Sequence, residues 1–507
     1  MGTLKATVAV AVMAAMAAAE EEGDPEVVGL NLGIAVMLLG SVAFMMATFY
    51  MVNHSDKEMR IITWKVICAT ISIFVSVLIY QAFNDAIHAL FLYDSSELVK
   101  MQVAFVHSLV WFIMLQLLLA TVSRAITWPC QGAVEDTPDD QRELDLKCWA
   151  VILGHITGFA SINAWTQLQA YCGGSVLILP LAFFSLWGLF KVTDIVREWV
   201  ALVDDGVKDK MEEAWDEATE ETEDDVMALT LSFLVVQTMR FWIYGVLPDE
   251  EGNLEVNLHA SFSQAFTSLG IGLSIAILSY LRTLYGTSKH TRYSIWLRLI
   301  ADFSSCWMVM FSIDRIMTLG SMGGAKFGVL GNVITACFLT FISFTVMYFL
   351  DKQADAEEEK HSVSETPQHE KELHSRRKVA MRATVLAIGV LIGFAWEKCF
   401  DVAVDETAER EADKVPPALV KVVLALMLAT LVVPAWRWYI LPVVRELGGF
   451  SEEEAEEEDD ESKEAYIPPI LPEDLYKEIE VWKKKAAQLQ EEKESLERQL
   501  RQMRPQH

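Results

Sequence analysis

The sequence predicts an all-α polytopic membrane protein. The chain has 507 residues, of which 52% are hydrophobic, and a mean hydropathy of +0.28. Its apolar residues gather in stretches of about twenty, the length of a helix that crosses a bilayer core of about 30 Å. Two further patterns are an internal repeat and a C-terminal heptad pattern. Together they predict about 11 transmembrane helices after a signal peptide, two parallel pseudo-repeats and a C-terminal cytosolic coiled coil.

Residues 1–19 have the features of a secretory signal peptide. Lys5 provides the positive N-terminal region, the apolar run follows, and Ala15-Met16-Ala17 provides small residues for cleavage. The alternative is an uncleaved first membrane helix. We favour cleavage because the segment is short and consists of Ala and Val rather than Leu and Phe.

Hydropathy and loop charge predict the spans and their orientation. The eleven predicted spans are 27–53, 60–92, 100–126, 147–171, 175–200, 225–247, 258–284, 293–318, 326–350, 377–402 and 417–441. Lys and Arg are concentrated in every second loop, whereas the opposite loops have few. The positive-inside rule therefore places the N-terminus outside or in a lumen and the C-terminus in the cytosol. We expect a multi-pass protein of the secretory pathway, in the plasma membrane or an organelle membrane.

The repeat is clearest in two apolar segments that lie 235 residues apart. Gly154-His-Ile-Thr-Gly158-Phe159-Ala160 recurs as Gly389-Val-Leu-Ile-Gly393-Phe394-Ala395. Because the equivalent spans differ by six helices, the halves 25–224 and 225–447 are predicted to be parallel repeats. Chance similarity among Gly- and Ala-rich helices is the alternative. The four glycines form GxxxG steps, which favour close helix packing over a ligand cradle.

The C-terminal region has a different composition. An acidic linker is predicted at 448–471, followed at 472–503 by apolar residues that alternate in steps of four and three. This seam predicts a coiled coil through which the chain self-associates, with a parallel homodimer as the expected state. A single solvated helix is the alternative, but it would leave the apolar seam without a partner.

Ionisable and amide side chains at membrane depth are the candidate functional residues, because they are costly to bury there. Glu397 and Asp401 lie four residues apart and, with Asp405, form a carboxylate ladder on one helical face. Such a ladder suits a cation or a proton relay. The transport-path candidates are Asp85, His88, Asn163, Gln167, Arg240, Asp302, Asp314, Arg315, Glu397, Lys398 and Asp401.

Each candidate also has a structural alternative. Asp314-Arg315 and Glu397-Lys398 could form ion pairs that neutralise one another between helices. Asp405 and Asp85 could reach the outer headgroups. All the candidates fall on even-numbered predicted helices, whereas the odd-numbered ones are nearly uniform hydrocarbon. We therefore expect even-numbered helices around a polar centre and odd-numbered helices against lipid.

Several functional classes are disfavoured. A net charge of −29 argues against nucleic acid as a partner. The chain has no HExxH, GxSxG, P-loop or dinucleotide-binding motif, so an enzyme is not expected. Cysteine and histidine spacings do not suggest a metal site, and no cofactor is predicted. Acidic exterior loops, including 249–255, would raise the local cation concentration, although ordinary surface solvation explains them too.

These observations favour a transporter or channel for a small cation or protons, or cation-coupled transport of a solute. Its partners would be the lipid bilayer, a second copy of the chain and the transported ion. A non-transporting membrane scaffold is the alternative. In that case the embedded charges only pair helices, and the coiled coil recruits a partner.

Overall fold

The structure is a computed structural model that describes residues 57–126, 139–202, 208–249, 251–254, 261–285, 291–320, 328–362, 368–410 and 415–447, with parts of 42–54. Within these ranges all regular structure is helical. The helices are α3 (Lys57–Phe91), α4 (Glu97–Ser123), α5 (Asp139–Tyr171), α6 (Ile178–Leu202), α7 (Lys210–Tyr244), α8 (Phe262–Tyr285), α9 (Arg292–Gly320), α10 (Gly328–Ser362), α11 (Gln368–Arg410), α12 (Pro417–Ala435), a π-helical turn (Trp436–Ile440) and α13 (Leu441–Glu446). The predicted signal peptide, most of the first predicted span, the acidic linker and the coiled coil lie outside the described residues.

Nine helices in the described ranges are long and apolar enough to cross a membrane, with the segment Pro417–Glu446 counted as one. The fold is thus that of a multi-pass, all-helical protein. Helix α5 is not among the nine, because polar residues such as His155, Asn163 and Gln167 lower its hydropathy. Most of its side chains between Ile152 and Gln169 are buried. A helix that is enclosed by other helices does not need an apolar surface.

Burial divides the helices into the two predicted groups. In α3, α7, α9 and α11, between 50% and 72% of an 18-residue apolar stretch is buried. In the other five candidate membrane helices the buried share of such a stretch is 6% to 39%. Helix α5 belongs with the first group. The helices predicted to surround a polar centre are therefore the enclosed ones, so this part of the prediction is confirmed.

Helix α7 begins well before the predicted span at 225–247. Asp209 caps it, because its Oδ1 accepts the backbone N–H groups of Met211 and Glu212, both at 2.8 Å. The Glu212 carboxylate accepts the Asp209 N–H in return, which completes a capping box. The acidic run that follows is helical, and the predicted boundary between halves at 224/225 falls inside this continuous helix.

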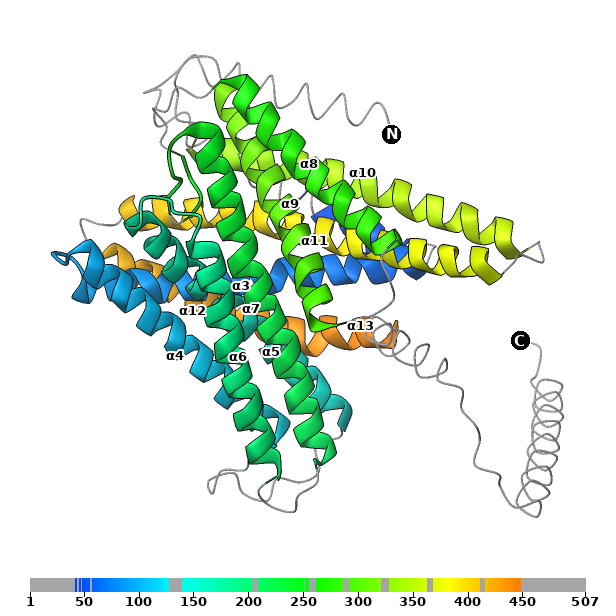
Figure 1. Ribbon diagram of the computed structural model, residues 1–507, viewed down its shortest axis with the longest axis horizontal. Helices are drawn as coiled ribbons and strands as arrows, with labels where there is room; N and C mark the ends of the chain where they lie inside the picture. Colours follow the sequence, from blue (N-terminus) through cyan, green and yellow to red (C-terminus); the bar gives the residue numbers. More distant parts are fainter. Residues whose placement is uncertain are drawn as a thin grey trace, which may run out of the picture. The chain divides into compact units, whose positions relative to one another are not determined.

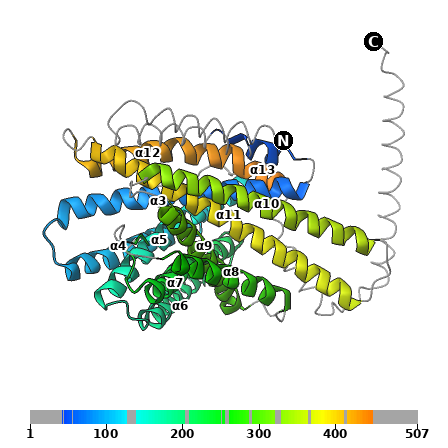
Figure 2. The ribbon, with the colours of Figure 1, turned by 90° about the horizontal axis from the view of Figure 1, so that it is seen from above.

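Two packing relations position the candidate site. Helix α11 runs beside α3 and α10, and α12 lies along α3, as both ribbon views show (Figures 1 and 2). Helix α7 packs against α4, α5, α6, α8 and α9. In Figure 1, α7 and α9 cross the direction of α3 and α11 rather than running along it.

The GxxxG glycines lie where α5 meets α7 and where α11 meets α3. A Cβ on Gly154 would come within 2.7 Å of a methyl group of Thr222 in α7. A Cβ on Gly389 would come within 2.9 Å of Val66 in α3. Gly158 and Gly393 continue the same contacts one turn later. The glycines thus allow α5 to approach α7, and α11 to approach α3, at short range.

Candidate functional site

A cavity of about 340 Å³ lies among the enclosed helices. Its wall consists of residues from α3, α5, α7, α9 and α11, with contributions from the start of α12 and from the segment that follows α7. Helices α3, α5 and α11 contribute most of the charged and amide side chains of the wall, whereas α7 and α9 contribute mainly aromatic ones. Chain segments far apart in the sequence therefore meet around a single space.

The carboxylate ladder of α11 faces this cavity. Glu397, Asp401 and Asp405 all line it, as their four-residue spacing predicts for one helical face. Asp85 from α3 and Glu251 from the segment after α7 add two more carboxylates. The only basic residues among those that line the cavity are Lys398 and Lys421, so the wall has a surplus of negative charge.

Lys421 neutralises two of these carboxylates. Its ammonium group lies 2.5 Å from Asp405 Oδ1 and also pairs with Asp85, so it joins α12 to both α11 and α3. Asp85 and Asp405 thus share one lysine, and a cation between two carboxylates offsets the cost of their partial burial. The alternative that these acids also reach the headgroups stays a prediction.

Lys398 forms an ion pair between helices, which was the structural alternative predicted from the sequence for this residue. Its Nζ lies 3.3 Å from Asp314 Oδ2 in α9. The pair joins the Asp314-Arg315 position of α9 to the Glu397-Lys398 position of α11, as that alternative described. Adjacent residues point to different sides of a helix, so tertiary packing selects the partner.

Three carboxylates of the wall remain without a cation. Glu397, Asp401 and Glu251 form no ion pair with any residue that the structure describes. Gln81 in α3 donates a hydrogen bond to Asp401. Glu251 stays exposed to the cavity, yet the surrounding protein limits its hydration and raises its pKa. The nearby carboxylates Asp249, Asp405 and Asp85 raise that pKa further.

Aromatic rings form another part of the wall, which we term the aromatic wall: Phe159, Phe233, Trp307 and Phe311. Trp307 stacks on Phe394 with 3.9 Å between ring centroids and lies parallel to Phe311 at 5.8 Å. Phe159 meets Phe394 edge to face at 6.3 Å. The two phenylalanines of the repeated GxxxGFA sequence are therefore in contact beside the cavity.

An amide cluster completes the wall on the α5 side. Asn163 Nδ2 donates to Asn84 Oδ1 at 3.2 Å, and Gln167 Nε2 donates to Asn163 Oδ1 at 3.0 Å. Asn163 and Asn84 line the cavity, whereas Gln167 lies behind Asn163. These hydrogen bonds hold the Asn163 side chain in one orientation.

The remaining predicted residues lie around the cavity or away from it. Arg240 donates to the carbonyl of Gly252 and lies 4.2 Å from the centre of the Phe311 ring, so it supports the segment that contains Glu251. Asp302 accepts a hydrogen bond from Ser279 Oγ at 2.5 Å. Asp302, His88 and Arg315 are not among the residues of the wall. Of the eleven predicted residues, the wall contains Asp85, Asn163, Glu397, Lys398 and Asp401.

Several residues of the wall were not predicted from the sequence. Glu251 lies in the acidic loop 249–255, so its negative charge was noticed but its position was not. Lys421 lies inside an apolar run, and a lysine there is itself a signal for a buried partner. The aromatic wall had no signal, because Phe and Trp are common in any membrane helix.

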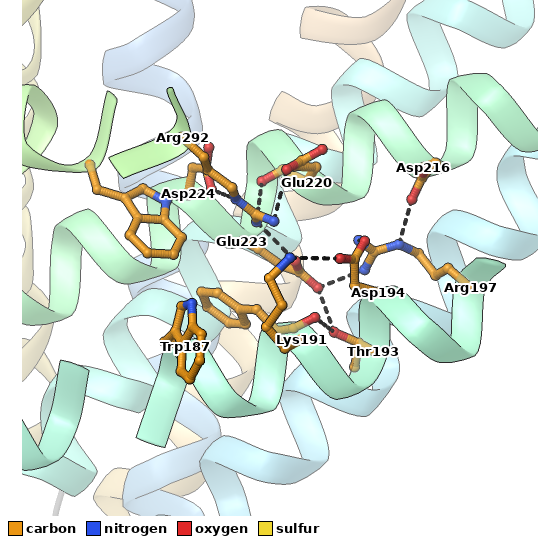
Figure 3. A network of polar contacts seen from close by, with 12 residues as sticks. Trp187, Lys191, Thr193, Asp194, Arg197, Asp216, Glu220, Glu223, Asp224 and Arg292 are labelled. Carbon is orange, nitrogen blue, oxygen red and sulfur yellow. Dashed lines mark hydrogen bonds and ion pairs between the residues drawn. The ribbon is translucent and has the colours of Figure 1, made fainter. Parts of the chain in front are cut away.

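A buried ion network between α6, α7 and α9 was also missed. Glu223 of α7 is fully buried and lies between Arg197 and Arg292 (Figure 3), whose guanidinium groups approach it at 2.7 Å and 3.1 Å. Arg197 also bonds to Asp216 at 2.8 Å, and Arg292 to Asp224 at 2.6 Å. Every acid in this network has a basic partner, so it differs from the cavity and suits a structural role.

In the described ranges, no three His, Cys, Asp or Glu side chains are grouped so that they could hold a metal ion. The carboxylates of the wall are thus spread around a space rather than gathered into a compact coordination cage. No family model, curated protein or solved structure matches this chain.

Proposed function

We propose that the protein is a transporter or channel for a small cation or protons, or for a solute coupled to them, and that the cavity is its cation site. One observation favours this function above the others. Glu397, Asp401 and Glu251 line a cavity among apolar helices without a cationic partner in the described residues. The other acids of the wall, Asp85 and Asp405, share Lys421.

The energetics of burial link this surplus to a cation. An ionised carboxylate in a low-dielectric environment is strongly disfavoured unless it is paired or protonated. A structural ion network removes the cost permanently, as the arginines do for Glu223. The unmatched acids can instead be neutralised by a proton or cation that arrives and leaves. Such reversible neutralisation is what a translocation site requires.

The finer architecture is part of the same proposal. Two parallel repeats would place equivalent residues next to each other near their axis, and the contact between Phe159 and Phe394 is consistent with this. The cavity is also lined by α3 and α5 from one proposed half and α9 and α11 from the other. The N-terminus would be exterior, the C-terminus cytosolic, and dimerisation would occur through 472–503.

Ion flux through purified protein in liposomes tests the function. We expect flux for at least one of H⁺, Na⁺ and K⁺, and a loss of more than about tenfold in Glu397→Gln and Asp401→Asn, since each removes a charge from the cavity. Asp94→Asn is the matched control, because Asp94 is an exposed acid outside the cavity. Its flux should equal that of the wild type.

Two results would contradict the proposal in different ways. Normal flux in both cavity variants would show that the path lies elsewhere. Absence of flux for every cation in the wild-type protein would favour the scaffold. Deletion of 472–503 would then abolish the cellular role, whereas a transporter should keep its flux per protomer.

A further inference from the structure

We propose that the ligand of this cavity is an organic ammonium ion with an aromatic or similarly sized apolar body. The inference rests on the proposed cation site and specifies the class of its substrate. It follows from the size of the cavity, from the two kinds of surface that line it and from the polar groups that have no partner.

The cavity is larger than a bare inorganic ion needs. Its volume of about 340 Å³ falls within the range of about 300–1,000 Å³ that is typical of small-molecule sites. Liquid water occupies about 30 Å³ per molecule, so Na⁺ or H₃O⁺ would leave most of the space to be filled by solvent. An organic ion with a ring and a short chain would displace that solvent.

The wall presents a negative part and an aromatic part. Glu397 and Asp401 provide charge for an ammonium group, while the aromatic wall provides apolar surface for the rest of the molecule. Aromatic faces also attract cations, which adds to the recognition of an ammonium ion. A hydrated metal ion would use the carboxylates but would leave the aromatic surface in contact with water.

Two buried polar atoms without hydrogen-bond partners among the described residues indicate which ligand groups the cavity would bind. Trp307 is 4% exposed, and its indole N–H has no acceptor among the described residues. The carbonyl oxygen of the Gln81 amide likewise has no donor within the described part of the chain. Buried polar groups normally have partners. An ammonium N–H supplies the donor that Gln81 lacks, and an acceptor on the ligand would satisfy Trp307.

The lysines of the wall favour an amine over a zwitterion. Lys421 is held by Asp85 and Asp405, and Lys398 is held by Asp314. A ligand carboxylate would have to compete with these acids for its cation. It would also add negative charge beside Glu397 and Asp401, which like-charge repulsion disfavours.

Binding to the purified full-length protein in detergent micelles, measured by calorimetry, tests the inference. The probes are phenethylammonium, the neutral analogue 2-phenylethanol, methylammonium and Na⁺. We expect phenethylammonium to bind at least about tenfold more tightly than each of the other three, which corresponds to about 1.4 kcal/mol. Asp401→Asn and Trp307→Ala, which removes an aromatic face from the wall, should each weaken its binding several-fold, whereas Asp94→Asn should not.

Four outcomes separate the possibilities. Equal binding of 2-phenylethanol would overturn the inference, because the site would then recognise only apolar surface. Equal binding of methylammonium or Na⁺ would also overturn it, because the aromatic wall would not contribute. Ion flux that depends on Glu397 without phenethylammonium binding would refute the inference and leave the proposed function standing. Phenethylammonium binding without flux of any cation would support the site and refute transport. Size-exclusion profiles identify variants that fail to fold.

Discussion

Glu223 offers the most quantitative test of the fold, because it is enclosed on every side. Its Oε1 accepts hydrogen bonds from Arg197 at 2.7 Å, Thr193 at 2.8 Å and Gln116 at 3.0 Å. Its Oε2 accepts one from Arg292 at 3.1 Å. These four donors come from three other helices and surround the carboxylate. The side chain of Arg197, the deepest donor, is only 2% exposed.

The perturbation is Glu223→Leu, Arg197→Met, and the two together. Removal of one partner from a buried ion pair leaves the other charge buried, which costs about 3–5 kcal/mol. We expect each single variant to lose stability in this range, toward the lower end. Arg197 retains Asp216 and Glu223 retains Arg292 when the other member is removed. The double variant replaces both charges with apolar groups, so its loss should be smaller than the sum by about 1–3 kcal/mol.

Denaturant titration of the purified protein in detergent micelles provides the assay, with loss of helical circular dichroism as the signal. Lys191→Ala is the matched control, because Lys191 pairs with Asp194 at 2.9 Å on the exposed side of the same network. That exposed pair should contribute less than about 1 kcal/mol. Single variants as stable as the control, or strictly additive losses in the double variant, would refute the reasoning.

Two further predictions concern packing and pH. Gly154→Ala should lower the melting temperature, at a cost of about 1–3 kcal/mol, because its Cβ would meet a Thr222 methyl group at 2.7 Å. Gly188→Ala in α6 is the control, because a Cβ added there would meet no atom within 4 Å, and it should be neutral or stabilising. Equal melting temperatures of the Gly154→Ala and Gly188→Ala variants would contradict the proposed packing at Gly154. For Glu251, the folded pKa lies above the unfolded one, so stability is lost as the pH rises through the interval between them. Glu251→Gln keeps an acceptor for the Asn253 side chain. The variant should therefore have a higher melting temperature than the wild type at pH 7 and the same melting temperature at pH 4. A melting temperature below that of the wild type at pH 7 would contradict this prediction.

The sequence predicted the helical class and five of the charged and amide residues of the cavity wall. Membrane-length apolar stretches indicate where helices form, and charged or amide residues inside them indicate which faces avoid lipid. The spacing of Glu397, Asp401 and Asp405 was sufficient to place them on one face, and all three line the cavity. The enclosed and outward helices were also separated correctly, because lipid contact tolerates few polar residues.

Helix ends and ion-pair partners were less predictable. From the sequence alone, the acidic start of α7 is typical of a solvated segment. In the structure, Arg197 and Arg292 form ion pairs with acids of this part of α7. Ion pairing between the helices of Asp314 and Lys398 was considered from the sequence, but the sequence left open which of their charged neighbours would form the pair. The signal peptide, the repeat, the orientation and the coiled coil remain predictions.

By itself, the sequence determined the local properties of this protein: which segments are helical, which helices are too polar for lipid, and which side chains share a helical face. These follow from the bilayer's dimensions and the helical period, which act within one segment. Only the tertiary structure decided which acids are neutralised and which are not. That outcome depends on whether helices separated by hundreds of residues bring a lysine to an acid, as α12 brings Lys421 to Asp85 while Glu397 receives no partner among the described residues.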